Sequence, residues 1–106
     1  MNWGKSWADD YIKDLEEGKT IKCRPHGNSM EPIIKSGQLV TISPIKERLK
    51  VGDIVLCRVK GNVYLHFIKQ ITYYTAGIVF YIIGNNKGYI NGATQSIFGI
   101  LTKIED

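Results

Sequence analysis

The sequence predicts a mainly β fold with one N-terminal α-helix, and three observations lead to this prediction. Residues 6–17 carry apolar side chains every four positions, which is the spacing of one helix face. From residue 19 onward, short apolar runs rich in valine, isoleucine and aromatic residues alternate with turns that contain glycine, asparagine or proline. The 106 residues, 43% hydrophobic and 23% charged, suit one globular domain over 1–106.

The first element is a short helix within an N-terminal helical segment, residues 1–18. Ser6 is a suitable N-cap, because a serine hydroxyl can accept a hydrogen bond from an amide of the first turn. Gly18 is a natural C-terminal stop. We expect the apolar stripe to pack on a sheet rather than on a membrane, because the opposite face is acidic; the stripe consists of Trp3, Trp7, Tyr11 and Leu15.

The β segment, residues 19–106, is expected to contain six strands. Their ranges are 20–25, 37–43, 53–60, 63–72, 78–84 and 96–104. Gly61 and Asn62 predict a two-residue hairpin turn between the third and fourth strands. Residues 85–94 hold three asparagines and two glycines, so we predict a loop there.

The composition excludes several classes of protein. The longest apolar run, residues 78–83, is too short to span a bilayer, and the first residues do not resemble a signal peptide. We therefore expect a cytoplasmic chain without a membrane span. Cys23 and Cys57 match no zinc-binding spacing, so we expect two buried free thiols, no metal and no cofactor.

The stretch Gly-Asn-Ser-Met-Glu-Pro, residues 27–32, allows two interpretations. Ser29 could simply cap a turn. It could instead be a nucleophile, in a loop that Gly27 lets approach other backbone closely and that Pro32 stiffens. A serine nucleophile needs a base within hydrogen-bond reach and donors for the oxyanion. Backbone N–H groups of the tight loop around Asn28 and Met30 could supply those donors.

Two histidines are candidates for the base. His26 is close to Ser29 in sequence, but neighbouring side chains in such a segment seldom converge. His66 lies in the strand 63–72, where alternation puts Tyr64, His66 and Ile68 on one face and Leu65, Phe67 and Lys69 on the other. A histidine there is either a hydrogen-bonded core residue or a partly buried general base.

Four motifs occur in the order and approximate spacing of the LexA-like and signal-peptidase-like serine peptidases (S24/S26 type). They are Ser29-Met30-Glu31-Pro32, Gly37-Gln38, Gly52-Asp53-Ile54-Val55 and, after the strand with His66, Gly84-Asn85-Asn86. The sequence resembles this family over roughly residues 20–104. The resemblance implies a small β-barrel-like fold with Ser29 as nucleophile. The family places lysine or histidine at the base position, so His66 makes this chain similar to the Ser/His variety.

The sequence also departs from the family pattern. Asn85 stands where the family has aspartate in a Gly-Asp-Asn motif, and Asn91 stands near the position of a second aspartate. Either asparagine could orient His66, with less electrostatic support than a carboxylate. Lys69 would be a poor substitute base, because it lies on the opposite face of the strand. Nothing upstream of Ser29 matches the self-cleavage site of the repressor branch.

The resemblance leads to one main functional hypothesis with two alternatives. The main hypothesis is a small serine peptidase with a Ser29–His66 dyad and a peptide or protein substrate. The first alternative keeps the fold as an inactive peptide-binding or protein-binding module of the kind that a phage or mobile element could encode. The second, ranked below both, is a basic nucleic-acid-binding barrel that uses Tyr73, Tyr74 and lysine residues; the net charge is +4. The densest basic cluster consists of Lys46, Arg48 and Lys50, and we expect it to be a solvated loop rather than a nucleic-acid surface. The sequence predicts no oligomeric state.

Overall fold

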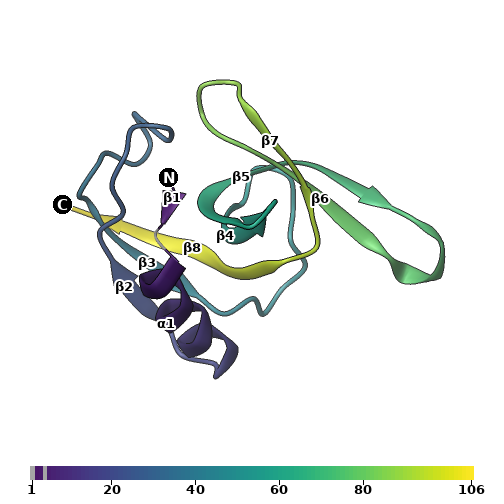
Figure 1. Ribbon diagram of the computed structural model, residues 1–106, viewed down its shortest axis with the longest axis horizontal. Coiled ribbons are helices and arrows are strands. Elements are labelled where there is room, and N and C mark those ends of the chain that lie inside the picture. Colours follow the sequence, from purple (N-terminus) through teal and green to yellow (C-terminus); the bar gives the residue numbers. More distant parts are fainter. Residues whose placement is uncertain (1, 4) are drawn as a thin grey trace.

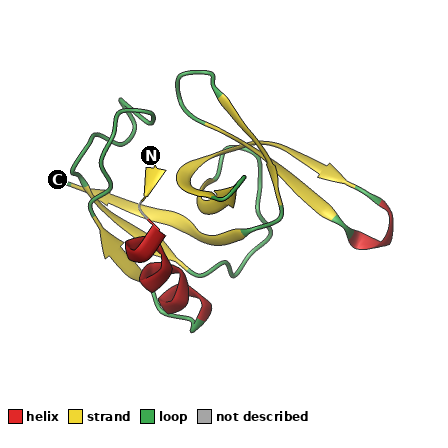
Figure 2. Ribbon diagram, in the orientation of Figure 1, coloured by secondary structure: helices red, strands yellow, loops and turns green. Residues whose placement is uncertain are grey.

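The protein is described by a computed structural model of residues 2–3 and 5–106, shown in Figure 1. One antiparallel sheet dominates it, and a single α-helix packs beside the sheet (Figure 2). The elements are β1 (Asn2–Trp3), α1 (Lys5–Glu16), β2 (Ile21–Cys23), β3 (Leu39–Ser43), β4 (Ile54–Val59), β5 (Asn62–Tyr73), η1 (Thr75–Gly77), β6 (Val79–Gly84), β7 (Ile90–Thr94) and β8 (Ile97–Glu105). The mainly β fold with one N-terminal α-helix is therefore confirmed. Within the described ranges, no helix combines the length and the apolar character needed to cross a membrane.

Helix α1, Lys5–Glu16, begins and ends one residue earlier than the predicted range 6–17. Because the helix starts at Lys5, Ser6 lies inside its first turn, and the prediction of Ser6 as N-cap is wrong. Gly18 adopts a φ of +85°, its amide donates to the Leu15 carbonyl at 3.0 Å, and the Lys19 amide donates to Asp14 at 2.9 Å. These bonds satisfy the last carbonyls of the helix, as expected for a glycine stop.

The helix packs on the sheet through a face broader than the predicted stripe. Its buried residues are Ala8, Ile12 and Leu15, with Tyr11 half-buried beside them. A Cβ atom on Gly99 of β8 would lie 3.0 Å from Leu15 Cδ1 and 2.8 Å from Ile42 Cγ2, so the bare backbone there lets the helix approach closely. The side chains of Trp3 and Trp7, part of the predicted stripe, lie outside the described residues.

The sheet runs in the order β2-β3-β8-β4-β5-β6-β7. Strand β1 lies outside this order and pairs antiparallel with β5. The tight hairpin between β4 and β5 is confirmed, but the two residues of its turn are Lys60 and Gly61 rather than Gly61 and Asn62. Both have positive φ, at 51° and 84°, which suits the twist of a two-residue hairpin. Asn62 instead pairs with Val59 as the first residue of β5.

The predicted loop 85–94 is wrong over its second half, because residues 90–94 form strand β7 on the edge of β6. The C-terminal end of β7 and the residues after it also contact β4. Thr94 Oγ1 donates to the Arg58 carbonyl at 2.6 Å, and the Arg58 amide donates to the Ser96 carbonyl at 3.0 Å. Tertiary pairing has overridden the weak strand propensity of asparagine and glycine here. The sheet therefore curls back on itself around β4 and β5 (Figure 1).

Strand β5 separates two hydrophobic clusters. Val63 and Leu65 belong to the cluster under α1, whereas Ile68 belongs to a second cluster with Val55 and Cys57 of β4. The predicted alternation of faces in β5 is therefore correct up to Ile68. A shift in pairing with β6 follows, between Ile68 and Gln70, so the alternation changes after that point. His66 lies on the face of the second cluster.

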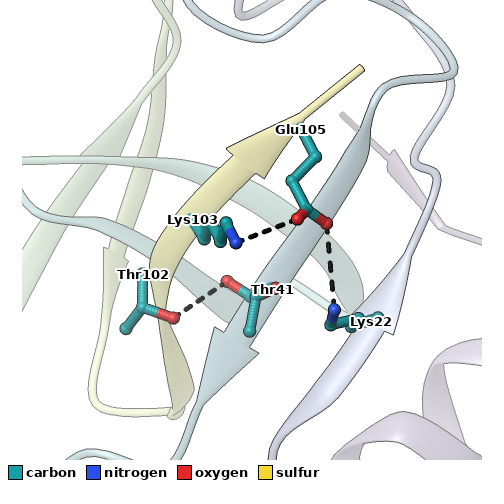
Figure 3. A network of polar contacts seen from close by, with 5 residues as sticks. All are labelled: Lys22, Thr41, Thr102, Lys103 and Glu105. Atoms are coloured by element: carbon teal, nitrogen blue, oxygen red, sulfur yellow. Dashed lines mark hydrogen bonds and ion pairs between the residues drawn. The ribbon is translucent and has the colours of Figure 1, made fainter.

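The far end of the sheet, at β2, β3 and β8, carries a small polar network (Figure 3). Glu105 bridges Lys103 at 3.0 Å and Lys22 at 3.8 Å, and the hydrogen bond from Lys103 lowers the pKa of its carboxyl group. Thr102 Oγ1 donates to the Thr41 carbonyl at 3.4 Å. Exposed ion pairs of this kind contribute little to stability, so this edge depends mainly on its backbone pairing.

Candidate active site

The loop between β2 and β3, residues 24–38, carries Ser29 and is closed by its own hydrogen bonds. The Gly27 amide donates to Ser36 Oγ at 3.0 Å, and the Gly37 amide donates to the Pro25 carbonyl at 2.9 Å. Gly27 has a φ of +120°, a conformation that side chains disfavour. Two fully buried side chains, Met30 and Ile34, anchor the loop in the core. This anchoring leaves Ser29 half-buried at the surface of the loop.

The structure brings Ser29, His66 and Asn91 into one line of hydrogen bonds. Ser29 Oγ lies 2.9 Å from His66 Nε2, and His66 Nδ1 lies 2.7 Å from Asn91 Oδ1. An amide oxygen can only accept, so in this arrangement Nδ1 carries the proton and donates it to Asn91. Nε2 then accepts the hydrogen bond of the serine hydroxyl. This is the tautomer that a base for Ser29 needs.

His66 is buried, with 3% of its surface exposed, and the ring of Tyr64 stacks on it at a centroid distance of 5.0 Å. Burial, assisted by nearby positive charge that includes Lys69, lowers the pKa of His66 from 6.5 to about 4. The hydrogen bond to Asn91 acts in the opposite direction. The imidazole is therefore neutral at pH 7 and able to accept a proton, but it is a weaker base than a solvated histidine.

A cavity of about 390 Å³ opens in front of Ser29 and His66. Among the residues that the structure describes, its wall contains asparagine amides, two tyrosines and glycine backbone but no carboxylate or lysine side chain; the residues are His26, Gly27, Asn28, Ser29, Tyr64, His66, Asn85, Tyr89 and Asn91. A neutral, open cavity beside a serine–histidine pair can receive an extended polypeptide segment.

The other predicted site residues take different positions. Asn28 lines the cavity, whereas the Met30 side chain is buried in the core, so only its backbone is left to act at the site. Asn85 also lines the cavity, but its Oδ1 accepts from the amides of Lys87 and Tyr89 at 2.8 and 3.0 Å. Of the two asparagines predicted to orient His66, Asn91 is the one that contacts the ring.

Two neighbours of the site had no role in the sequence prediction. Tyr64 was placed on the His66 face by alternation, yet its ring stacking needs the three-dimensional structure. Asn86 was part of the Gly84-Asn85-Asn86 motif, and the structure shows that it binds the Ser29 loop. Lys69 is exposed and its Nζ lies 4.9 Å from the centre of the Phe67 ring, which points that ammonium group at an aromatic face.

The remaining polar candidates lie elsewhere. The predicted basic cluster occupies the exposed loop between β3 and β4, where it lines a separate cavity of about 410 Å³. Tyr73 and Tyr74 are exposed at the tip of the β5–β6 hairpin. Cys23 and Cys57 are buried free thiols, as predicted. In the part of the chain that the structure describes, no three histidine, cysteine, aspartate or glutamate side chains gather as metal ligands.

Comparisons with known proteins give one positive finding. A family model described as Peptidase S24-like matches residues 1–96, which covers both the Ser29 loop and the strands that carry His66 and Asn91. Searches of curated proteins and of solved structures find no match.

Proposed function

This chain belongs to the Peptidase S24-like family, and we propose that it is a serine peptidase in which Ser29 is the nucleophile and His66 the general base. The observation that carries this proposal is the line of hydrogen bonds from Ser29 Oγ through His66 to Asn91, at 2.9 and 2.7 Å. Its substrate is a peptide or an extended segment of a protein, which enters the neutral cavity in front of Ser29.

The first half of the reaction forms an acyl-enzyme. Ser29 Oγ attacks the scissile carbonyl carbon while its proton passes to His66 Nε2. Backbone N–H groups in the tight turn around Asn28 and Met30 hold the oxyanion. When the C–N bond breaks, the imidazolium returns its proton to the leaving amine. Asn91 keeps Nδ1 as the donor, so Nε2 is always the nitrogen that exchanges the proton.

The second half regenerates the serine. A water molecule gives a proton to His66 Nε2 and attacks the ester carbonyl, and the ester bond to Ser29 Oγ breaks. His66 then protonates the departing serine oxygen, so the carboxylic product and the starting protein are restored. Each half-reaction passes through an imidazolium, and Asn91 offers that charge a dipole rather than a full negative charge. We therefore propose a slow peptidase.

The low basicity of His66 also favours a second candidate function. With a pKa of about 4 and no carboxylate on Nδ1, the same cavity would suit a binding module that holds an extended peptide without cutting it. The two candidates share the fold and the cavity. They differ in whether the peptide bond in front of Ser29 is broken.

The test is cleavage of a diverse pool of unstructured peptides, read by mass spectrometry between pH 6 and pH 9. Ser29→Ala and His66→Ala are compared with Ser96→Ala, a control that removes an exposed hydroxyl outside the cavity. Cuts made by the unchanged protein and the control, but by neither site variant, would support the peptidase. Cuts that persist in Ser29→Ala would contradict it. Peptide binding without cutting by any of the four proteins would identify the binding module.

A further inference from the structure

We propose that Asn86 is a positioning residue that holds the Ser29 loop at hydrogen-bonding distance from His66, an inference that rests on the proposed peptidase function. The Asn86 amide N–H donates to the Ser29 carbonyl at 3.0 Å. Its side-chain Nδ2 donates to the Glu31 carbonyl, also at 3.0 Å. One residue thus binds the nucleophile loop on both sides of Met30, across 55 positions of sequence. Figure 1 shows the loop between β6 and β7, which carries Asn86, near the loop between β2 and β3, which carries Ser29.

The loop that carries Asn86 is closed by hydrogen bonds of its own, to which Ser29 does not contribute. The Asn85 amide donates to the Tyr89 carbonyl at 2.9 Å, and Asn85 Oδ1 accepts two amides of the same turn. Gly84 makes this closure possible, because a Cβ atom there would lie 2.7 Å from the Tyr89 carbonyl oxygen. Hydrogen bonds within the turn therefore define its conformation, and Asn86 connects the turn to the loop that carries Ser29.

The same turn also leads directly to the residue that contacts the ring of His66. The chain leaves the turn at Tyr89 and enters β7, and Asn91 of β7 binds His66 Nδ1 at 2.7 Å. Only the four residues 87–90 therefore separate Asn86, which binds the Ser29 backbone, from Asn91, which binds the imidazole. The distance between Ser29 Oγ and His66 Nε2 then depends on a short, closed piece of chain.

The hydrogen bonds within the Ser29 loop cannot replace Asn86 in this role. The bonds at Gly27 and Gly37 join parts of the same loop, so they fix its shape but not its distance from β5. Met30 and Ile34 anchor the loop in the cluster under α1, whereas His66 lies on the other face of β5. Asn86 supplies a direct polar link from the His66 side of the sheet to the backbone of Ser29.

Substitution of Asn86 removes its side-chain bond to the Glu31 carbonyl but leaves its backbone bond to the Ser29 carbonyl. Neither bond involves the substrate, so the substitution should affect catalysis more than substrate binding. Small displacements of a reacting group cost up to about 100-fold in rate. We expect Asn86→Ala to lower kcat by about 10- to 100-fold with KM changed by less than about three-fold. Asn86→Asp keeps the shape of the side chain but replaces the Nδ2 donor with an acceptor that faces the Glu31 carbonyl, so we expect a loss at least as large.

The experiment measures kcat and KM for both variants, together with the ¹⁵N NMR signals of the His66 imidazole in the absence of substrate. Asn62→Ala is the matched control, because Asn62 is an exposed asparagine in the β4–β5 hairpin. In Asn86→Ala and Asn86→Asp, the Nε2 signal of His66 should move toward that of a nitrogen without a hydrogen bond. Nδ1 should stay protonated, because it still donates to Asn91. The control should change neither the kinetics nor the signals.

Two results would overturn the proposal: an Nε2 signal unchanged in Asn86→Ala and Asn86→Asp, or a fall in kcat matched in the Asn62→Ala control. The imidazole measurement needs no turnover, so it keeps this proposal separate from the peptidase proposal. If the unchanged protein cleaves nothing, the peptidase proposal fails, and the Nε2 signal alone decides whether Asn86 positions Ser29.

Discussion

Strands β5 and β7 both contribute to the candidate site, but they are held in place by different forces. His66 stands on β5, which pairs with β4 and β6 and contains the buried residues Val63, Leu65 and Ile68. Asn91 stands on β7, the last strand in the sheet order, where Thr94 is the buried residue among five. The proposed base is therefore held by the hydrophobic core, whereas the residue that contacts its Nδ1 is held by hydrogen bonds at the edge.

Because of this difference, we expect substitutions on β5 to affect mainly stability and substitutions on β7 to affect mainly the reaction rate. Apolar burial on β5 contributes to the free energy of folding, so changes there should lower stability and leave the geometry of the remaining folded molecules intact. Polar contacts on β7 and its preceding loop contribute little net free energy, so changes there should affect the rate and leave the fold intact. Three experiments test this separation, beginning with the largest expected effect.

Truncating the core of β5 should have the largest effect. Leu65→Ala removes a fully buried side chain, and such changes lower the free energy of unfolding by about 2–5 kcal/mol. Ile90→Ala on β7 is the matched control: 50% of its surface is exposed, so its cost should be much smaller. Urea unfolding measures both, and kcat per folded molecule should stay unchanged in Leu65→Ala. Equal costs for the two variants would contradict the comparison.

The second experiment is a pH titration of stability and activity. The fold lowers the pKa of His66 from 6.5 to about 4, so folding favours the neutral ring. This contribution is complete above pH 6.5 and is lost as the pH falls toward 4, because only the unfolded chain gains the proton in that window. The loss should reach roughly 3 kcal/mol at about 1.4 kcal/mol per pH unit.

Unfolding by urea at several pH values measures this loss, and His66→Gln serves as the control. The variant should lose the part of the pH dependence between 6.5 and 4 that belongs to one proton. In the unchanged protein, kcat/KM should fall on the acid side with an apparent pKa near 4. An acid limb near 6.5, or an unchanged slope of stability in His66→Gln, would show that burial does not control this ring.

The smallest effect is expected from a change of charge at the edge strand. Asn91→Asp places a carboxylate on His66 Nδ1, which stabilises the imidazolium and raises the pKa of His66. One pKa unit of stabilisation in the transition state would raise kcat by about ten-fold. Kinetics at pH 8 and NMR titration of His66 measure the two effects, with Asn91→Ala as the variant that should lower kcat. A raised pKa without a gain in kcat would contradict the role assigned to Asn91.

Much of the β5 half of the site follows from the sequence. Alternation places His66 on the face of Tyr64 and Ile68, and the structure agrees, because strand periodicity is a local property that the core enforces. The turn before β5 was predicted one residue too late. Lys60 adopts a positive φ that the sequence gives no reason to expect of lysine, so the two-residue hairpin signal was assigned to Gly61 and Asn62.

The β7 half was harder to predict. Its asparagines and glycines indicate a loop, and only pairing with β6 makes residues 90–94 a strand. The resemblance to a known family suggested both Asn85 and Asn91 as partners of His66, and spacing alone could not choose between them. The choice depends on the turn that Gly84 permits, since this turn engages Asn85 internally and carries Asn91 on to the ring.

The reactivity of the two buried thiols can be used to measure transient opening of the fold. Burial raises the pKa of both Cys23 and Cys57 to about 12, so an alkylating reagent near neutral pH must wait until a thiol is exposed to solvent. Cys23 lies on β2 at one end of the sheet order, whereas Cys57 lies on β4 inside it. The alkylation rate of Cys23 should follow local fraying of the β2–β3 hairpin, and that of Cys57 should follow opening of the whole sheet. Comparing the two rates would show whether the loop that carries Ser29, which joins β2 to β3, opens independently of the rest of the sheet.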